Sequence, residues 1–111
     1  MKILTKLEEN VLLTTLKLKD NAYIVTIKDS LEDFTGKTIS FGALYVSLNR
    51  LIRYGYLKNY LGESTSTQGG RAKKYYKLTN EGIEALKEIQ KLQSVMWEDF
   101  SRLADEMKEV E

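Results

Sequence analysis

The chain has 111 residues, 42% of them hydrophobic, and its 17 basic and 16 acidic side chains almost cancel. It contains neither cysteine nor histidine, which excludes disulfides, thiolate nucleophiles, imidazole bases and the usual zinc sites. No stretch approaches the roughly 20 apolar residues of a membrane span, and the first residues do not resemble a signal peptide, so we expect one small cytoplasmic domain with no membrane contact.

A first helix is predicted to begin near Lys6. Thr5 followed three residues later by Glu8 is a capping box, in which the hydroxyl accepts a first-turn N–H and the carboxylate reaches back to the cap. The helix should end near residues 19–21. Its apolar stripe is wider than one packing contact needs, so we expect part of it to meet another chain. The stripe consists of Leu7, Val11, Leu12, Leu16 and Leu18.

A second helix of about three turns is predicted from Ala22, because apolar residues recur there at helical spacing. Asp29 and Asp33 lie one turn apart on its outer side, but no third ligand or phosphate-binding loop accompanies them. A solvated surface therefore explains them better than the metal site of a hydrolase. We expect no enzyme, no metal and no cofactor. The inward residues should be Tyr23, Ile24, Ile27, Leu31 and Phe34.

A third helix is predicted between Ser40, a suitable N-cap, and Gly55, a glycine stop. A helix in the major groove contacts base edges mainly through its N-terminal residues, and small side chains there let the backbone come close. Gly42, Ala43 and Ser47 fit that role, and packing of Gly42 and Ala43 against a neighbouring helix is the alternative. The inward set is Phe41, Leu44, Tyr45, Leu48, Leu51 and Ile52, and the outward set is Gly42, Ala43, Val46, Ser47, Asn49, Arg50 and Arg53.

Two short strands joined by a polar loop are predicted after this helix, over residues 56–61 and 73–78. The glycine pair at 69–70 allows positive φ at the tip of the hairpin. A helix followed by a hairpin is the order of a recognition helix and its wing. Alternation along the second strand predicts Tyr76 and Leu78 inside, with Tyr75 and Lys77 outside.

Positive charge is concentrated between residues 37 and 78, which hold eight basic residues and one acidic residue, whereas the rest of the chain holds nine basic and 15 acidic residues. Such a cluster is typical of a surface that binds duplex DNA, because each neutralised phosphate releases condensed counterions. A solvated basic face is an equally good explanation of the charge alone. The eight are Lys37, Arg50, Arg53, Lys58, Arg71, Lys73, Lys74 and Lys77.

A C-terminal helix is predicted from its N-cap Thr79, and no stop signal follows Ile83. Heptad spacing aligns eight seam positions, seven of them apolar, with no protein left to cover them, which predicts pairing with another chain. Gln93 is a polar interruption that would fix the register. A frayed tail is the alternative and fits only the acidic end. The seam comprises Leu86, Ile89, Gln93, Met96, Phe100, Leu103, Met107 and Val110, with Leu92, Val95 and Trp97 beside it.

Several motifs occur in a fixed order: Gly-Ala-Leu-Tyr at 42–45, Leu-Asn-Arg-Leu at 48–51, Gly-Tyr-Leu at 55–57, and Gly-Arg-Ala-Lys-Lys-Tyr-Tyr-Lys-Leu-Thr at 70–79 followed by Gly82. Together they resemble the PadR family of winged helix-turn-helix transcriptional regulators, over about residues 5–86. Two departures concern base preference more than fold. Val46 stands where a proline is common, and residues 52–54 replace the usual acidic residue before the glycine.

The resemblance implies a mainly α fold with a small β-hairpin: a winged helix-turn-helix DNA-binding domain over residues 1–79 and one long C-terminal dimerisation helix over residues 80–111. It also implies a homodimeric repressor on a palindromic operator in double-stranded DNA. The single C-terminal helix is similar to that of the short subfamily, in which flat aromatic or hydrophobic effectors enter an apolar space at the dimer interface beside a tryptophan. Trp97 is on the corresponding helix, further along, and an ordinary interface tryptophan is the alternative.

Under this interpretation three sets of residues would contact DNA. Base edges would meet Gly42, Ala43, Val46 and Ser47, nearby phosphates would meet Thr38, Ser40 and Tyr45, and the DNA backbone would be anchored by Arg50, Arg71, Lys73 and Lys74.

The alternative, from another class of function, is a protein-interaction module whose basic face binds an acidic partner, because fold alone does not determine function.

Overall fold

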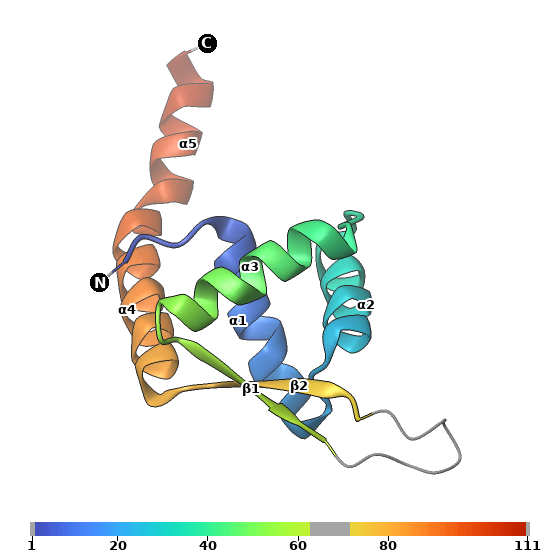
Figure 1. Ribbon diagram of the computed structural model, residues 1–111. Helices are drawn as coiled ribbons and strands as arrows, with labels where there is room; N and C mark the ends of the chain where they lie inside the picture. Colours follow the sequence, from blue (N-terminus) through green and yellow to red (C-terminus); the bar gives the residue numbers. More distant parts are fainter. Residues whose placement is uncertain (1, 63–71, 111) are drawn as a thin grey trace.

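Three helices, a β-hairpin and two C-terminal helices follow one another in the computed structural model, which describes residues 2–62 and 72–110 (Figure 1). The hairpin lies along one edge of the helical group, and the C-terminal helices extend away from it. The elements are α1 (Lys6–Leu18), the 3-10 turn η1 (Lys19–Asn21), α2 (Ile24–Thr35), α3 (Phe41–Arg53), β1 (Leu57–Leu61), β2 (Lys74–Leu78), α4 (Asn80–Trp97) and α5 (Phe100–Val110).

Helix α1 begins with the predicted capping box. The backbone N–H of Glu8 donates to Thr5 Oγ1 at 3.1 Å, and the N–H of Thr5 donates to Glu8 Oε1 at 2.8 Å. These bonds satisfy two of the N–H groups that a helix start leaves without intrahelical partners. The predicted start of α1 and its end near residue 19 are confirmed.

Helix α2 starts two residues later than predicted and ends at Gly36, whose φ of 69° closes the last turn. Ile27 and Leu31 are buried as expected, but Phe34 is 65% exposed, so its predicted inward position is wrong. Phe34 lies in the last turn of α2, at the edge of the core, where the Lys17 ammonium sits 5.6 Å from the centre of its ring.

Strands β1 and β2 form an antiparallel hairpin in which Leu57 lies opposite Leu78. Tyr76 and Leu78 are buried and Lys77 is exposed, as predicted, whereas Tyr75, expected outside, is partly buried against Tyr23 and Tyr60. The hairpin is attached to the segment before α2, because the N–H of Tyr76 donates to the carbonyl of Ala22 at 2.8 Å. The predicted loop glycines at 69–70 lie outside the described residues.

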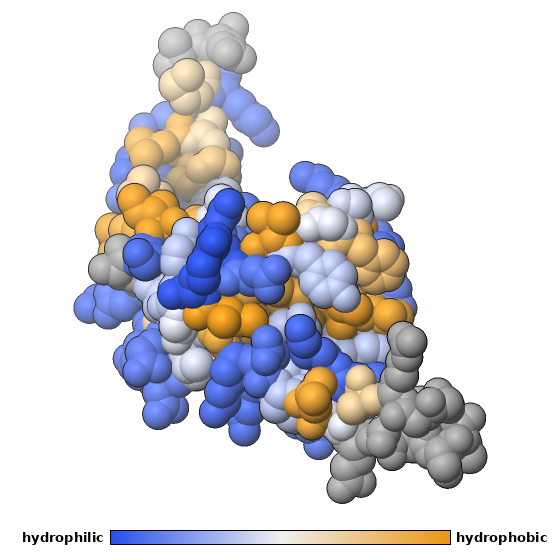
Figure 2. Space-filling model, in the orientation of Figure 1, coloured by the Kyte–Doolittle hydropathy of each residue, from blue (hydrophilic) through white to orange (hydrophobic). Residues whose placement is uncertain are grey.

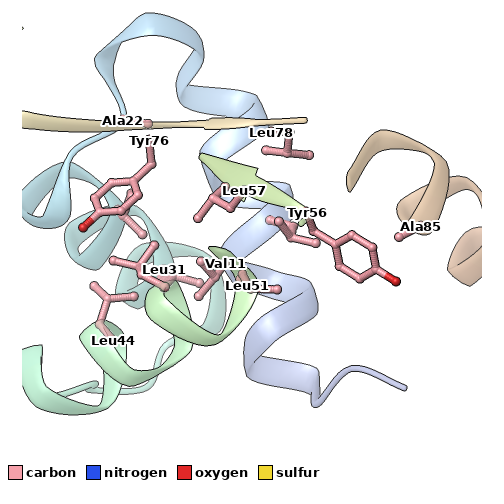
Figure 3. Close-up of a cluster of buried hydrophobic side chains, with 13 residues drawn as sticks. Val11, Ala22, Leu31, Leu44, Leu51, Tyr56, Leu57, Tyr76, Leu78 and Ala85 are labelled. Atoms are coloured by element: carbon pink, nitrogen blue, oxygen red, sulfur yellow. The ribbon is translucent and has the colours of Figure 1, made fainter. Parts of the chain in front are cut away.

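One hydrophobic core joins α1, α2, α3, the hairpin and the start of α4 (Figure 3). Tyr56 reaches from the end of α3 to Ala85 of α4. Gly82 allows this approach, since a Cβ at that position would lie 2.1 Å from the Tyr56 carbonyl oxygen. The core residues are Val11, Leu12, Ala22, Ile27, Leu31, Leu44, Leu48, Leu51, Tyr56, Leu57, Tyr76, Leu78 and Ala85.

The C-terminal segment is helical, but a break at residues 98–99 divides the predicted single helix into α4 and α5. Asp99 has a φ of 65°, a left-handed conformation that aspartate tolerates better than most residues. Trp97 and Phe100 face each other across the break, with ring centres 5.0 Å apart. No glycine or proline marks this position, which is why sequence patterns missed it. None of the described helices combines the length and apolar character needed to cross a membrane.

Candidate nucleic-acid interface

Helix α3 presents one side to solvent over its first three turns. The opposite side packs into the hydrophobic core through Leu44, Leu48 and Leu51, all fully buried. Ser40 caps its start as predicted, since the N–H of Ala43 donates to Ser40 Oγ at 3.1 Å. The exposed residues are Phe41, Gly42, Ala43, Tyr45, Val46, Asn49 and Arg53.

Three residues of α3 lie on a different side from the one predicted. Phe41 and Tyr45 were expected to point inward and are almost half exposed, whereas Ser47 was expected to point outward and is only 6% exposed. The buried positions 44, 47, 48 and 51 follow the i, i+3, i+4, i+7 spacing, which places Ser47 inside the packed stripe. A serine can occupy it because it is small. Ser47 is therefore not available to contact a base edge.

Arg50, predicted to anchor the DNA backbone, is paired with an acidic residue of α1. Its Nη1 lies 3.3 Å from Oε2 of Glu8, whose side chain is 2% exposed. A buried carboxylate requires a partner, and Arg50 supplies it. The Arg50 side chain itself remains 40% exposed.

The turn before α3 is held by Glu32 of α2. Its Oε2 accepts from Lys28 Nζ at 2.9 Å and from the N–H of Ile39 at 3.0 Å. The hydrogen bond from Lys28, and after it that from Ile39, lowers the pKa of the Glu32 carboxyl below its ordinary value of 4.5. The neighbouring Thr38 and Ser40 remain exposed at the N-terminal end of α3, where they were predicted to meet phosphates.

Lysines line the hairpin beside α3. Lys58 lies directly opposite Lys77 across the two strands, a pairing of like charges that destabilises a sheet unless an anion offsets it. Lys73 and Lys74 are exposed, and Lys73 Nζ lies 4.3 Å above the ring centre of Tyr23. Figure 2 shows hydrophilic side chains gathered over the hairpin. The predicted contact Arg71 lies outside the described residues.

A hollow of about 270 Å³ separates α3 from the first half of β2 and the residue before it. Tyr23 stands at the N-cap of α2 on one wall and Tyr45 of α3 on another, with Lys73 and Lys74 at the rim. Burial, and after it the nearby Tyr45, raises the pKa of Tyr76, so its hydroxyl stays protonated. Tyr23 was not among the predicted contacts, because its place beside the lysines depends on how the hairpin packs.

The predicted dimerisation seam divides into two parts. Leu86, Ile89 and Gln93 are partly covered by α1 of the same chain, and Gln93 Nε2 donates to Glu9 Oε1 at 2.8 Å. Gln93 thus has a partner within its own chain, so its predicted role in setting the register between chains is not needed to explain it. The rest of the seam is exposed at Met96, Phe100, Leu103 and Met107, with Trp97 beside it.

A groove of about 370 Å³ runs between α1 and α4, next to this exposed apolar surface. Leu13 and Leu16 of α1 and Ile89 of α4 are among its lining residues, and both leucines are exposed. Leu16 of the predicted stripe thus contributes exposed apolar surface on α1, and Leu13, which was not in the stripe, adds to it. Within residues 2–62 and 72–110, no three acidic side chains come close enough to hold a metal ion.

Comparison with known proteins gave one family. Residues 12–88 match the model described as the transcriptional regulator PadR-like family. No curated protein sequence gave a significant match.

Solved structures of similar proteins cover almost the whole chain. A PadR family transcriptional regulator from Eggerthella lenta is 28% identical with a TM-score of 0.67, over 89% of this chain and 86% of that one. A PadR-like transcription factor from Bacteroides fragilis is 28% identical with a TM-score of 0.63, over 91% and 88% of the two chains. RosR of H. salinarum has a TM-score of 0.69 over 97% and 94%, and at 22% identity it supports the fold alone.

Proposed function

Because the chain belongs to the PadR-like family of transcriptional regulators, and so is a DNA-binding regulator and not an enzyme, we propose that it is a homodimeric repressor that binds a palindromic operator. Residues 1–79 would bind DNA in the cytoplasm, and residues 80–111 would pair the two copies. The observation that carries the proposal is the exposed side of α3 directly beside a hairpin rich in lysine.

Helix α3 would enter the major groove with its first two turns. Gly42 adds no side chain, and the Ala43 and Val46 side chains are apolar and exposed, Val46 at 55%. Apolar side chains discriminate bases mainly through the C5 methyl group of thymine. Asn49, one turn further along, is suited to the donor and acceptor pair of adenine. The proposed half-site is therefore one in which A·T pairs meet Ala43, Val46 and Asn49.

Phosphates on either side of this groove would meet the hollow and the hairpin. The start of α2 carries the positive end of a helix dipole, and Tyr23, Tyr45, Lys73 and Lys74 surround the space in front of it. Thr38 and Ser40 would reach the strand near the N-terminus of α3, and Arg71 would extend the contact from the wing.

The C-terminal helices would supply the two-fold axis. Phe100, Leu103 and Met107 are exposed on α5, and the α1–α4 groove offers an apolar surface of the same kind. If the C-terminal helices of one copy cover the groove of the other, both surfaces are buried twice in one symmetric contact. Two recognition helices in such a dimer read half-sites about 34–36 Å apart, one turn of DNA.

A flat aromatic or hydrophobic effector is the proposed signal for release. Trp97 is 64% exposed at the end of α4, beside the surface through which the copies would pair. A ligand that binds one spacing of the two winged domains better than another shifts the population away from the DNA-competent form. If Trp97 is instead an ordinary interface residue, its fluorescence changes on dimerisation and does not respond to such ligands.

Fluorescence anisotropy tests the proposal directly. Labelled duplex from upstream of the protein's own gene is titrated beside a scrambled duplex at several salt concentrations. We expect tight binding to the native duplex, with a steep loss of affinity as salt rises. Equal and weak binding to both duplexes would contradict specific repression at that site and would direct attention to an acidic protein partner.

A further inference from the structure

We propose that Glu8 and Glu9 are positioning residues: α1 fixes the angle between the recognition helix α3 and the C-terminal helix α4 through two buried carboxylates, one bound to each helix. This inference rests on the proposed repressor function. It adds a route by which a change at the dimer contact would alter DNA binding.

The first carboxylate, that of Glu8, is bound to α3. One oxygen accepts from the N–H of Thr5 at 2.8 Å, which caps α1, and the other lies 3.3 Å from Nη1 of Arg50. Arg50 follows Val46 by one turn of α3, and its side chain is 40% exposed. This contact links α1 to the recognition helix close to its groove-facing side.

The second carboxylate, that of Glu9, is bound to α4. Its Oε1 accepts from Gln93 Nε2 at 2.8 Å and lies 3.5 Å from the Lys6 ammonium. Gln93 precedes Met96 and Trp97 by about one turn, directly before the exposed apolar surface that we assign to dimerisation. A displacement of α4 on dimerisation would therefore move Gln93, the hydrogen-bond partner of the Glu9 carboxylate.

The two links are connected because Glu8 and Glu9 are neighbours on one helix. Adjacent helical residues point about 100° apart, so the two side chains reach different partners from the same turn. Both residues are buried, Glu8 at 1% and Glu9 at 8% exposure. A buried carboxylate without a partner is energetically costly. A movement that separates either carboxylate from its partner must therefore also change the packing around α1.

A double-mutant cycle tests the inference. Gln93→Met removes the amide at nearly constant volume, and Arg50→Met removes the guanidinium. We expect each single variant to weaken operator binding about tenfold, within the usual range of coupling between sites, and the double variant to weaken it by about the same factor. Two independent structural effects would instead multiply to about a hundredfold. A hundredfold loss, or unchanged binding by Gln93→Met, overturns the inference.

Matched variants separate positioning from stability. Ser94→Met introduces the same side chain at the next position of α4, which is exposed and does not line the α1–α4 groove, and Glu9→Gln keeps an acceptor for Gln93. Both should bind operator within threefold of the wild type. Sedimentation of every variant measures dimerisation, and a Gln93→Met loss explained wholly by weaker dimerisation also overturns the inference.

A distance measurement keeps the test independent of DNA. The chain has no cysteine, so Asn49→Cys on α3 and Lys91→Cys on α4 can carry two spin labels, diluted with unlabelled protein so that distances within one chain are observed. Gln93→Met should shift or broaden the distribution of distances, and Ser94→Met should not. An unchanged distribution contradicts the link even if the protein binds DNA, whereas a wild type that binds no duplex contradicts the repressor proposal and leaves this readout valid.

Discussion

Replacing Lys73 and Lys74 with alanine should flatten the dependence of DNA binding on salt. Both lysine side chains are exposed next to α3, and the Lys73 ammonium lies over the Tyr23 ring. Each lysine–phosphate contact contributes about 0.9 to the slope of log K against log salt, and a dimer loses four such lysines. The slope should therefore become shallower by about 3.6, and the loss of affinity between 50 and 200 mM salt should shrink by roughly a hundredfold.

The assay is anisotropy with specific and scrambled duplexes across that range of salt. Because lysine–phosphate contacts carry no sequence information, affinity should fall for both duplexes. The matched control replaces Lys91 of α4 and Lys108 of α5, which changes the net charge equally at exposed sites on the C-terminal helices. An unchanged slope in the hairpin variant, or an equal change in the control, would refute the assignment of the hairpin as a DNA-contacting wing.

Four further outcomes are expected. Gly82→Ala should lower the free energy of unfolding by about 1–3 kcal/mol in urea titrations, because its Cβ would overlap the Tyr56 carbonyl, and wild-type stability would refute that close approach. Glu32→Gln should cost stability above pH 4.5 and nothing at low pH, since a carboxyl whose pKa is depressed by folding stabilises only while ionised; a difference that persists in acid would contradict this. Phe100→Asp should leave the protein folded but monomeric by sedimentation, and a variant that remains dimeric would place the interface elsewhere. Replacing the contacted thymine by deoxyuridine should weaken binding about fourfold, the equivalent of one methyl group, and Val46→Ala should abolish that difference; equal sensitivity in the variant would refute the thymine contact.

The starts of α1, α3 and α4 were predictable because the chemistry of a cap is local. Thr5, Ser40 and Thr79 each accept an N–H from the first turn of the helix that follows, as their sequence contexts indicate. The inward positions of Tyr76 and Leu78 follow in the same way from the two-residue period of a strand. Such features depend on neighbours within a few residues, so no knowledge of packing is required.

Predictions failed for residues at the edge of the buried side of a helix, where periodicity does not say whether the side chain faces the core or solvent. Ser47 and Arg50 lie at the margins of the buried stripe of α3, and the positions of α1 and α2 decide which margin is covered. Gln93 fits the heptad seam of a two-chain helix pair, yet Glu9 of the same chain is its partner. Local periodicity does not distinguish these alternatives, and the packing of the helices against one another decides between them.

The amino-acid order alone thus determined the winged helix-turn-helix pattern, the basic middle segment and the apolar C-terminal surface, because caps, periodicity and charge depend on residues that are close together in the sequence. Only the tertiary structure decided how these residues lie relative to the prospective DNA: it buried Ser47, paired Arg50 with Glu8, and placed Tyr23 beside Lys73. It also placed Glu8 and Glu9 between the two functional helices. Those assignments arise from contacts between residues far apart in the chain, which no local pattern encodes.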